Sequence, residues 1–310
     1  MTVFKLFPTI ILIVAHCFVA AQTSHFVLSD DSVKLHYKTI GTGHPILIIN
    51  GGPGFSSDGF QAMATEIAKQ GYQTILYDQR GTGQSLMEKT DSHTITMDLM
   101  TKDIEAIRKD LKIKEWVVLG HSFGGMMAYY YATRHPDQIK AIVASSSGGL
   151  DLSLLGTTAS AIQAKLSPAE ADSLAYWRTQ RNSGENQELA RRQYAKFLAP
   201  AYVYKRENIP TVAKRLTEGN TELNALVWRN LIQINYDCSE ALKTFAKPVL
   251  IIQGKEDILQ IELAEKADRV FPNSTLVLLD SCGHYGWLDQ PGKYYNSIFT
   301  FLDQQVLYAK

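Results

Sequence analysis

The chain has 310 residues, of which 45% are hydrophobic and 20% are charged, and its formal net charge is zero. This length and apolar content are sufficient for one large core, or for a core with a smaller subdomain. A neutral chain without a basic run is not expected to have nucleic acid or an anionic membrane surface as its main partner.

The first 21 residues have the pattern of an export signal. Lys5 precedes an apolar stretch over residues 6–15, and Val19, Ala20 and Ala21 then supply the small residues that a signal peptidase requires. The apolar stretch is shorter than the roughly 20 residues that span a bilayer. We therefore expect an exported protein, periplasmic or secreted, that is cleaved before Gln22 and has no membrane anchor in its mature form.

Strand-like and helix-like segments then alternate along the chain. Residues 25–40 alternate between apolar and polar side chains, which is typical of an antiparallel edge hairpin. The segment 97–111 has apolar residues at helical spacing, and Thr96 is a suitable N-cap for it. Strands that alternate with helices predict an α/β fold with a mostly parallel sheet covered on both faces. The short apolar runs expected as buried strands are 46–49, 74–77, 116–119, 141–144, 249–252 and 276–279.

This alternation is interrupted for about a hundred residues that are rich in helix-forming residues. Ser167 and Glu170 have the spacing of a capping box, with a proline at the first helical position. The simplest arrangement is a helical cap over the carboxyl edge of the sheet. We therefore expect a signal peptide over 1–21, a core in two parts over 22–149 and 246–310, and a cap over 150–245.

Ser122 lies in a G-x-S-x-G motif, GHSFG, directly after one predicted strand and before a helix expected over residues 126–134. In such a strand-to-helix turn the serine adopts a strained conformation, and its backbone neighbours leave no room for side chains at the flanking positions. A glycine-rich turn with an incidental serine is the alternative. The position between strand and helix favours a nucleophile.

Three motifs together resemble the α/β-hydrolase superfamily, and within it the proline iminopeptidase branch of serine aminopeptidases. They are NGGPG at residues 50–54, DQRGTGQS at residues 78–85 and GHSFGG at residues 120–125. The chain departs from this branch at Asn50, where histidine is usual, and in GHSFGG, where GGSWGG is usual. The resemblance covers residues 30–150 and 245–305, and the cap region shows little that aligns.

The order of serine, acid and histidine along this chain is also similar to that of the family. Asp257 follows the strand at 249–252 and matches the G-x-x-D pattern of the family's acid loop, with Glu256 as its neighbour. His284 follows the last predicted strand, in a loop similar to the family's histidine loop. We therefore expect Ser122, Asp257 and His284 to form a catalytic triad. For Asp257 the alternative is a solvated charge cluster on a loop.

An oxyanion hole needs two backbone N–H groups near the nucleophile. We expect one from Phe123, which follows the serine, and one from Gly52 in the glycine loop, although an ordinary tight turn is the alternative for that loop. His121 is interpreted as packing support. Asp78 and Arg80 are interpreted as structural, in a loop ion pair or as caps.

No metal-ligand spacing is present, so no metal or other cofactor is expected. Cys238 and Cys282 would remain after removal of the leader, and the sequence leaves their pairing open. The oligomeric state also stays open.

The expected chemistry is hydrolysis through an acyl-enzyme, with a small molecule or short peptide as substrate. The resemblance implies an aminopeptidase whose cap carboxylates hold the substrate's amino group, and Glu207, Glu222 and Glu240 are available in the cap. A carboxylesterase or lipase-like hydrolase of small esters, or a non-catalytic binding protein on the same fold, are the alternatives. An aromatic lining of the cap is indicated by Tyr176, Trp177, Trp228 and Tyr236.

Overall fold

The computed structural model describes residues 22–184 and 186–307, so the export signal expected over residues 1–21 lies outside the described residues. The strands are β1 (Gln22–Leu28), β2 (Lys34–Ile40), β3 (His44–Ile49), β4 (Tyr72–Tyr77), β5 (Trp116–His121), β6 (Ile139–Ser145), β7 (Val249–Gly254) and β8 (Ser274–Leu279). The helices are α1 (Gln61–Ala68), α2 (Met97–Asp110), α3 (Phe123–Arg134), α4 (Thr158–Lys165), α5 (Pro168–Ser183), α6 (Gln187–Leu198), α7 (Ile209–Thr217), α8 (Thr221–Gln233), α9 (Ser239–Leu242), α10 (Ile261–Val270), α11 (Gly286–Asp289) and α12 (Pro291–Leu302).

The eight strands form one sheet in the order β1-β2-β4-β3-β5-β6-β7-β8. Strand β2 is antiparallel to both of its neighbours, β1 and β4, while β3 to β8 run parallel to one another. The predicted α/β class and the edge hairpin are confirmed. A parallel sheet of this kind brings the carboxyl ends of its strands to one edge, where α/β proteins bind their ligands.

Alternate residues of each strand pack on opposite faces of the sheet. Leu47 and Ile49 of β3 pack with α2, α3 and α10, whereas Ile46 and Ile48 pack with α1 and α12. Both faces of the central strands are therefore buried, which explains why these strands are continuous apolar runs rather than alternating ones.

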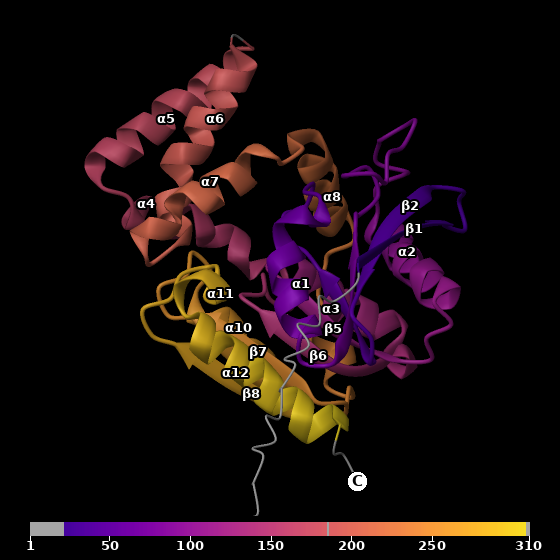
Figure 1. The fold of residues 1–310 in the computed structure, drawn as a ribbon. Helices are drawn as coiled ribbons and strands as arrows, with labels where there is room; N and C mark the ends of the chain where they lie inside the picture. Colours follow the sequence, from indigo (N-terminus) through magenta and orange to yellow (C-terminus); the bar gives the residue numbers. More distant parts are fainter. Residues whose placement is uncertain (1–21, 185, 308–310) are drawn as a thin grey trace, which may run out of the picture.

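Helices α4 to α9 fill the interval between β6 and β7, and Figure 1 shows α5 and α6 side by side as a pair that projects from the body of the molecule. Two predicted helix starts are confirmed. The Thr96 side chain accepts a hydrogen bond from the backbone of Leu99, and Ser167 and Glu170 form the expected capping box.

The two described cysteines, Cys238 and Cys282, are free and buried in different core clusters. Burial raises the pKa of each thiol to about 12, so both stay protonated at neutral pH. Within residues 22–184 and 186–307, none of the helices has the length and apolar character needed to cross a bilayer.

Candidate active site

Ser122 forms the turn between β5 and α3 and has φ 56° and ψ −120°. Positive φ is unfavourable for a residue with a side chain, so the surrounding structure must hold this conformation. The Ser122 N–H donates to the carbonyl of Ser145 at 3.0 Å, and the N–H of Gly148 donates to the Ser122 carbonyl at 3.1 Å. The loop after β6 thus fixes the turn that exposes the serine hydroxyl.

The flanking glycines are required because backbone passes directly beside them. A Cβ atom on Gly120 would lie 2.2 Å from the carbonyl oxygen of Gly124, and one on Gly124 would lie 2.0 Å from that of Ile49. Neither position can hold a side chain without displacing backbone. The motif glycines therefore let α3 start at Phe123, three residues earlier than predicted.

Asp257 and His284 are joined by a hydrogen bond of 2.8 Å between the carboxylate Oδ1 and the ring Nδ1. Asp257 also accepts from the side chain of Gln253 at 2.9 Å and from the backbone of Leu259 at 3.1 Å. Its neighbour Glu256 turns away and accepts from the backbone of Cys282. With Nδ1 bound to the carboxylate, a neutral imidazole keeps its lone pair on Nε2.

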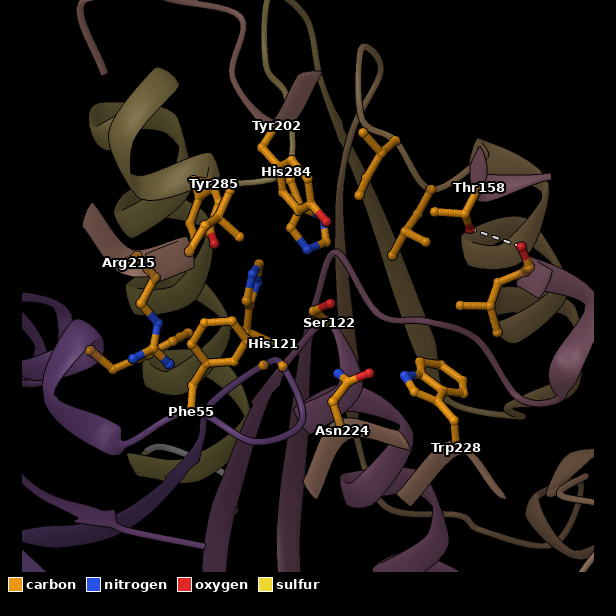
Figure 2. A pocket seen from close by; sticks show the side chains of 17 residues that line it. Phe55, His121, Ser122, Thr158, Tyr202, Arg215, Asn224, Trp228, His284 and Tyr285 are labelled. Carbon is orange, nitrogen blue, oxygen red and sulfur yellow. Dashed lines mark hydrogen bonds between the residues drawn. The ribbon is translucent and has the colours of Figure 1, made fainter. Parts of the chain in front are cut away.

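Ser122 and His284 line the same cavity, and Figure 2 shows the imidazole directed toward the serine. The hydroxyl and the ring make no hydrogen bond in this conformation, although both residues lie within the described part of the chain. Hydrogen bonds of this type often form only when substrate is bound. The structure thus brings Ser122, Asp257 and His284 into one site.

The histidine loop is attached to the cap. The His284 N–H donates to the carbonyl of Tyr202 at 2.8 Å. The buried Asp289 carboxylate accepts from the backbone of Gly283 at 2.9 Å, and also from that of Tyr204 at 2.8 Å and Lys205 at 3.0 Å. One carboxylate therefore connects the loop that carries the imidazole to the segment that follows α6.

The two expected oxyanion donors, Phe123 and Gly52, are both close to the serine, one next to it in the chain and one in the lining of its cavity. Phe123 is the first residue of α3, so its N–H has no acceptor within the helix. Gly52 lines the cavity with φ 147°, and a Cβ atom on Gly51 would lie 2.9 Å from the Cβ of Ser122. Asn50 supports this loop, because its side chain donates to the carbonyls of Gly51 and Phe55 at 3.1 Å each.

His121 has the packing role interpreted from the sequence. Its buried ring lies against His284 at a centroid distance of 4.7 Å, and against Phe60 and Trp287. Burial, together with the nearby charges of His284 and Arg215, lowers the pKa of His121 well below its usual value. This ring therefore stays neutral and positions the neighbouring imidazole by contact.

The cavity has a volume of about 230 Å³, and its walls come from both the core and the cap. Among the described residues that line it there is no carboxylate. Apart from the two histidines, the ionisable side chain that can carry a positive charge there is Arg215 of α7. The lining residues drawn in Figure 2 are Gly51, Gly52, Phe55, Phe60, His121, Ser122, Leu154, Thr158, Tyr202, Arg215, Leu216, Asn224, Trp228, Ile258, Leu259, His284 and Tyr285.

Arg215 was not predicted from the sequence. Its Nη1 donates to the Ser56 carbonyl at 2.8 Å, its guanidinium lies 4.6 Å from the centroid of the Phe55 ring, and its buried Nη2 has no partner among the described residues. Burial lowers the pKa of this guanidinium. Its partner carbonyl is 159 positions away in the chain, so local sequence gave no signal for it.

The cap residues considered from the sequence lie mostly elsewhere. Glu207, Glu222 and Glu240 are exposed and do not line the cavity. Of the four aromatic residues, Trp228 lines it, whereas the other three do not, so that part of the expectation was wrong. Tyr176 and Trp177 contact each other on α5, and the Tyr236 hydroxyl lies in the core, 3.1 Å from each of two carbonyls.

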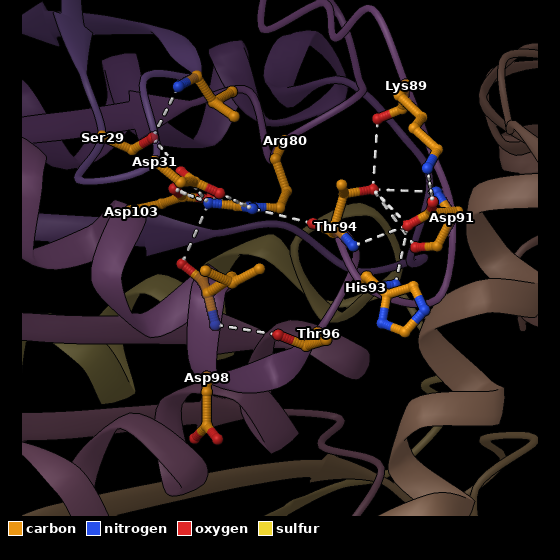
Figure 3. Close-up of polar contacts among 12 residues, drawn as sticks. Ser29, Asp31, Arg80, Lys89, Asp91, His93, Thr94, Thr96, Asp98 and Asp103 are labelled. Carbon is orange, nitrogen blue, oxygen red and sulfur yellow. Dashed lines mark hydrogen bonds and ion pairs between the residues drawn. The ribbon is translucent and has the colours of Figure 1, made fainter.

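Arg80 is buried in an ion pair, as interpreted, and Figure 3 shows its partners. The guanidinium donates two bonds to Asp103, at 2.6 and 2.7 Å, and also binds Asp31 at 2.9 Å. Asp78 instead pairs with His36 at 2.9 Å and accepts from Ser57 and Gln84. These groups stabilise the loop after β4.

A strained serine after β5, with a carboxylate–imidazole pair on the loops after β7 and β8, defines the α/β-hydrolase class. The family model described as "alpha/beta hydrolase fold" matches residues 44–291, so the chain belongs to this family of hydrolases.

Within the family, the chain is similar to proline iminopeptidases, which confirms the resemblance. It is 25% identical to the proline iminopeptidase of Lactobacillus helveticus over 283 residues, covering 87% of this chain and 95% of the relative. It is 27% identical over 280 residues to that of Lactobacillus delbrueckii subsp. bulgaricus, covering 84% and 90%.

Solved structures share the fold. The proline iminopeptidase of Mycobacterium smegmatis matches with a TM-score of 0.72 and 19% identity, covering 93% of this chain and all of that one. An esterase from Exiguobacterium antarcticum matches with a TM-score of 0.70 and 18% identity, covering 90% and 98%.

Proposed function

We propose that the protein is a serine hydrolase that works through an acyl-enzyme. The observation that carries this proposal is the 2.8 Å bond between Asp257 and His284 in the cavity that contains the strained Ser122. His284 takes the proton of the serine hydroxyl, and the serine oxygen attacks the substrate carbonyl carbon. The N–H groups of Phe123 and Gly52 then stabilise the oxyanion.

The same imidazole returns the proton to the leaving group as the carbonyl re-forms, which leaves an acyl group on Ser122. Water, deprotonated by His284, attacks this acyl group; the bond to the Ser122 oxygen then breaks, His284 returns the proton to that oxygen, and the acid is released. Asp257 keeps the ring in the required tautomer and stabilises its cationic form. No metal or other cofactor takes part in this scheme.

A fluorophosphonate probe tests this mechanism directly. We expect covalent labelling of the wild-type protein at Ser122, read by peptide mass spectrometry, and no labelling of Ser122→Ala. Ser153→Ala is a control, because this serine lies on the cap and does not line the cavity. An unlabelled but folded wild-type protein would contradict the proposal and leave the non-catalytic alternative.

For the substrate we propose short peptides, from which the enzyme removes the N-terminal residue. The names of the curated relatives support this assignment, together with their coverage of most of the chain. The volume of the cavity around Ser122, about 230 Å³, also suits a small terminal residue.

A second candidate is the hydrolysis of small carboxylic esters. It is favoured by the absence of a carboxylate from the described cavity lining, because a peptide's ammonium group would find no counter-charge there. Hydrolysis of proline naphthylamide, compared with that of p-nitrophenyl acetate, separates the two. Rapid ester turnover without cleavage of any aminoacyl naphthylamide would reject the aminopeptidase.

We also propose that the protein is exported, which rests on the apolar leader before Gln22. Expression of the full chain, followed by N-terminal sequencing of the exported fraction, tests this. We expect the mature protein to begin at Gln22. Retention of an intact N-terminus in the cell would contradict it.

A further inference from the structure

A second cavity of about 370 Å³ adjoins the candidate active site, and we call it the vestibule. It lies among α5, α6, α7 and α8, and it shares five lining residues with the active-site cavity. The two cavities are therefore neighbouring parts of one hollow under the cap. The shared residues are Gly52, Phe55, Tyr202, Leu216 and Asn224.

The charged groups of the vestibule lining are two arginines, Arg181 at the end of α5 and Arg191 on α6. Arg181 packs over the Tyr194 ring, 4.1 Å from its centroid. Neither arginine forms an ion pair with a described carboxylate, whereas the adjacent Arg192 pairs with Glu188. The vestibule thus has two cationic groups whose charge the described residues leave uncompensated.

A helix terminus also contributes positive charge to the vestibule, in addition to the two arginines. Asn220 and Thr221, at the start of the 13-residue α8, also line the vestibule. The N-terminus of a helix carries a partial positive charge, which adds to the field of the two guanidinium groups. The exposed Glu222 in the first turn and the Asn220 side chain, which accepts from the N–H groups of Glu222 and Leu223, offset part of this charge. The vestibule lining itself holds no aspartate or glutamate among the described residues.

We propose that the vestibule binds a carboxylate at the end of the substrate that is remote from the scissile carbonyl. Guanidinium groups bind carboxylates with charge-assisted, often bidentate hydrogen bonds. This inference rests on the proposed hydrolase function. In a short peptide the group is the C-terminal carboxylate, because the cationic amino end would be repelled by the vestibule. In an ester it is a free acid carried by the alcohol part, on the same side of the scissile carbonyl as the C-terminus of a peptide.

Matched substrates test the proposal. We compare kcat/KM for prolyl-alanine with that for prolyl-alaninamide, and for acetoxyacetate with that for acetoxyacetamide. At low ionic strength we expect the wild type to have a kcat/KM about tenfold higher for the acid than for its uncharged partner, in whichever pair it cleaves. High salt should reduce this preference. The double variant Arg181→Gln, Arg191→Gln should lose most of it.

Arg192→Gln is the matched control, because this exposed residue lies next to Arg191 and does not line the vestibule. We expect it to keep the acid preference. An uncharged amide that is cleaved as well as its acid by the wild type, or an equal loss in Arg192→Gln and the double variant, would overturn the proposal.

Calorimetry on Ser122→Ala separates this inference from the proposed chemistry. Tighter binding of prolyl-alanine or acetoxyacetate than of its uncharged partner, lost in the Arg181→Gln, Arg191→Gln background, supports the vestibule even if the wild type cleaves none of them. Equal binding within both pairs, or no binding of any of the four, overturns it, whether or not probe labelling supports the hydrolase.

Discussion

The imidazole rings of His121 and His284 lie against each other with centroids 4.7 Å apart, yet their polar partners differ. His284 bonds to the Asp257 carboxylate at 2.8 Å, whereas Nδ1 of His121 lies 3.4 Å from the Ser145 hydroxyl. A carboxylate supports a cationic ring and a hydroxyl does not. The two histidines are therefore suited to different roles, His284 to that of the proposed base and His121 to packing.

The role of His121 predicts a pH dependence of stability. Its pKa is lowered in the folded protein, so unfolding takes up a proton below about pH 6.5, the usual pKa of histidine. Stability from this residue is thus present above pH 6.5 and falls with decreasing pH, by up to about 1.4 kcal/mol per pH unit.

We expect His121→Leu to remove this part of the slope when the free energy of unfolding is measured from pH 5 to 8. His93→Leu, at an exposed position, serves as the control. Parallel pH profiles for the wild type and His121→Leu would contradict a neutral, buried His121.

The assignment of Asp257 as the acid of the proposed triad can be tested against its neighbour Glu256. Asp257→Asn should lower kcat by about 10³–10⁴, because the ring then loses the group that fixes its tautomer. Glu256→Gln should change kcat little, since Glu256 bonds to the backbone of Cys282 instead. Steady-state kinetics on whichever substrate is cleaved measures both, with circular dichroism to verify folding. If Glu256→Gln lowered kcat more than Asp257→Asn, the acid would be Glu256 and not Asp257.

Gly124 predicts a stability effect that is independent of catalysis. A Cβ atom there would meet the Ile49 carbonyl at 2.0 Å, so Gly124→Ala should destabilise the protein by about 3 kcal/mol or prevent folding. Gly292, on α12, has no atom within 4 Å of the corresponding position. Gly292→Ala should therefore be neutral or stabilising by up to about 1 kcal/mol in urea denaturation. Equal midpoints for the two variants would refute this packing.

The buried pair of Arg80 and Asp103 is expected to matter more than a surface pair. Asp103→Ala leaves a buried guanidinium without its bidentate partner, at a cost of about 3–5 kcal/mol. Glu188→Ala breaks the exposed pair with Arg192 and should cost about 0–1 kcal/mol. Thermal or urea unfolding of both variants gives the comparison, and similar losses would mean that the buried pair contributes little net stability.

The sequence predicted the core better than the cap, for a physical reason. Buried parallel strands are local apolar runs, and a G-x-S-x-G turn is set by neighbouring glycines, so 46–49 and Ser122 were recognisable. Which face of a cap helix is directed toward the cavity depends on its packing against residues that are distant in the sequence. Trp228 reaches the cavity while Tyr236 is in the core, and no periodicity distinguishes them.

The contacts of Asp289 constrain how substrate can enter. This carboxylate holds Gly283, beside the imidazole, and also Tyr204 and Lys205 of the cap. A rigid swing of that part of the cap would carry His284 away from Ser122. We therefore expect substrate entry to use motion of the projecting α5 and α6, and we expect a foreign cap grafted onto this core to need the 202–205 stretch to hold His284 in place.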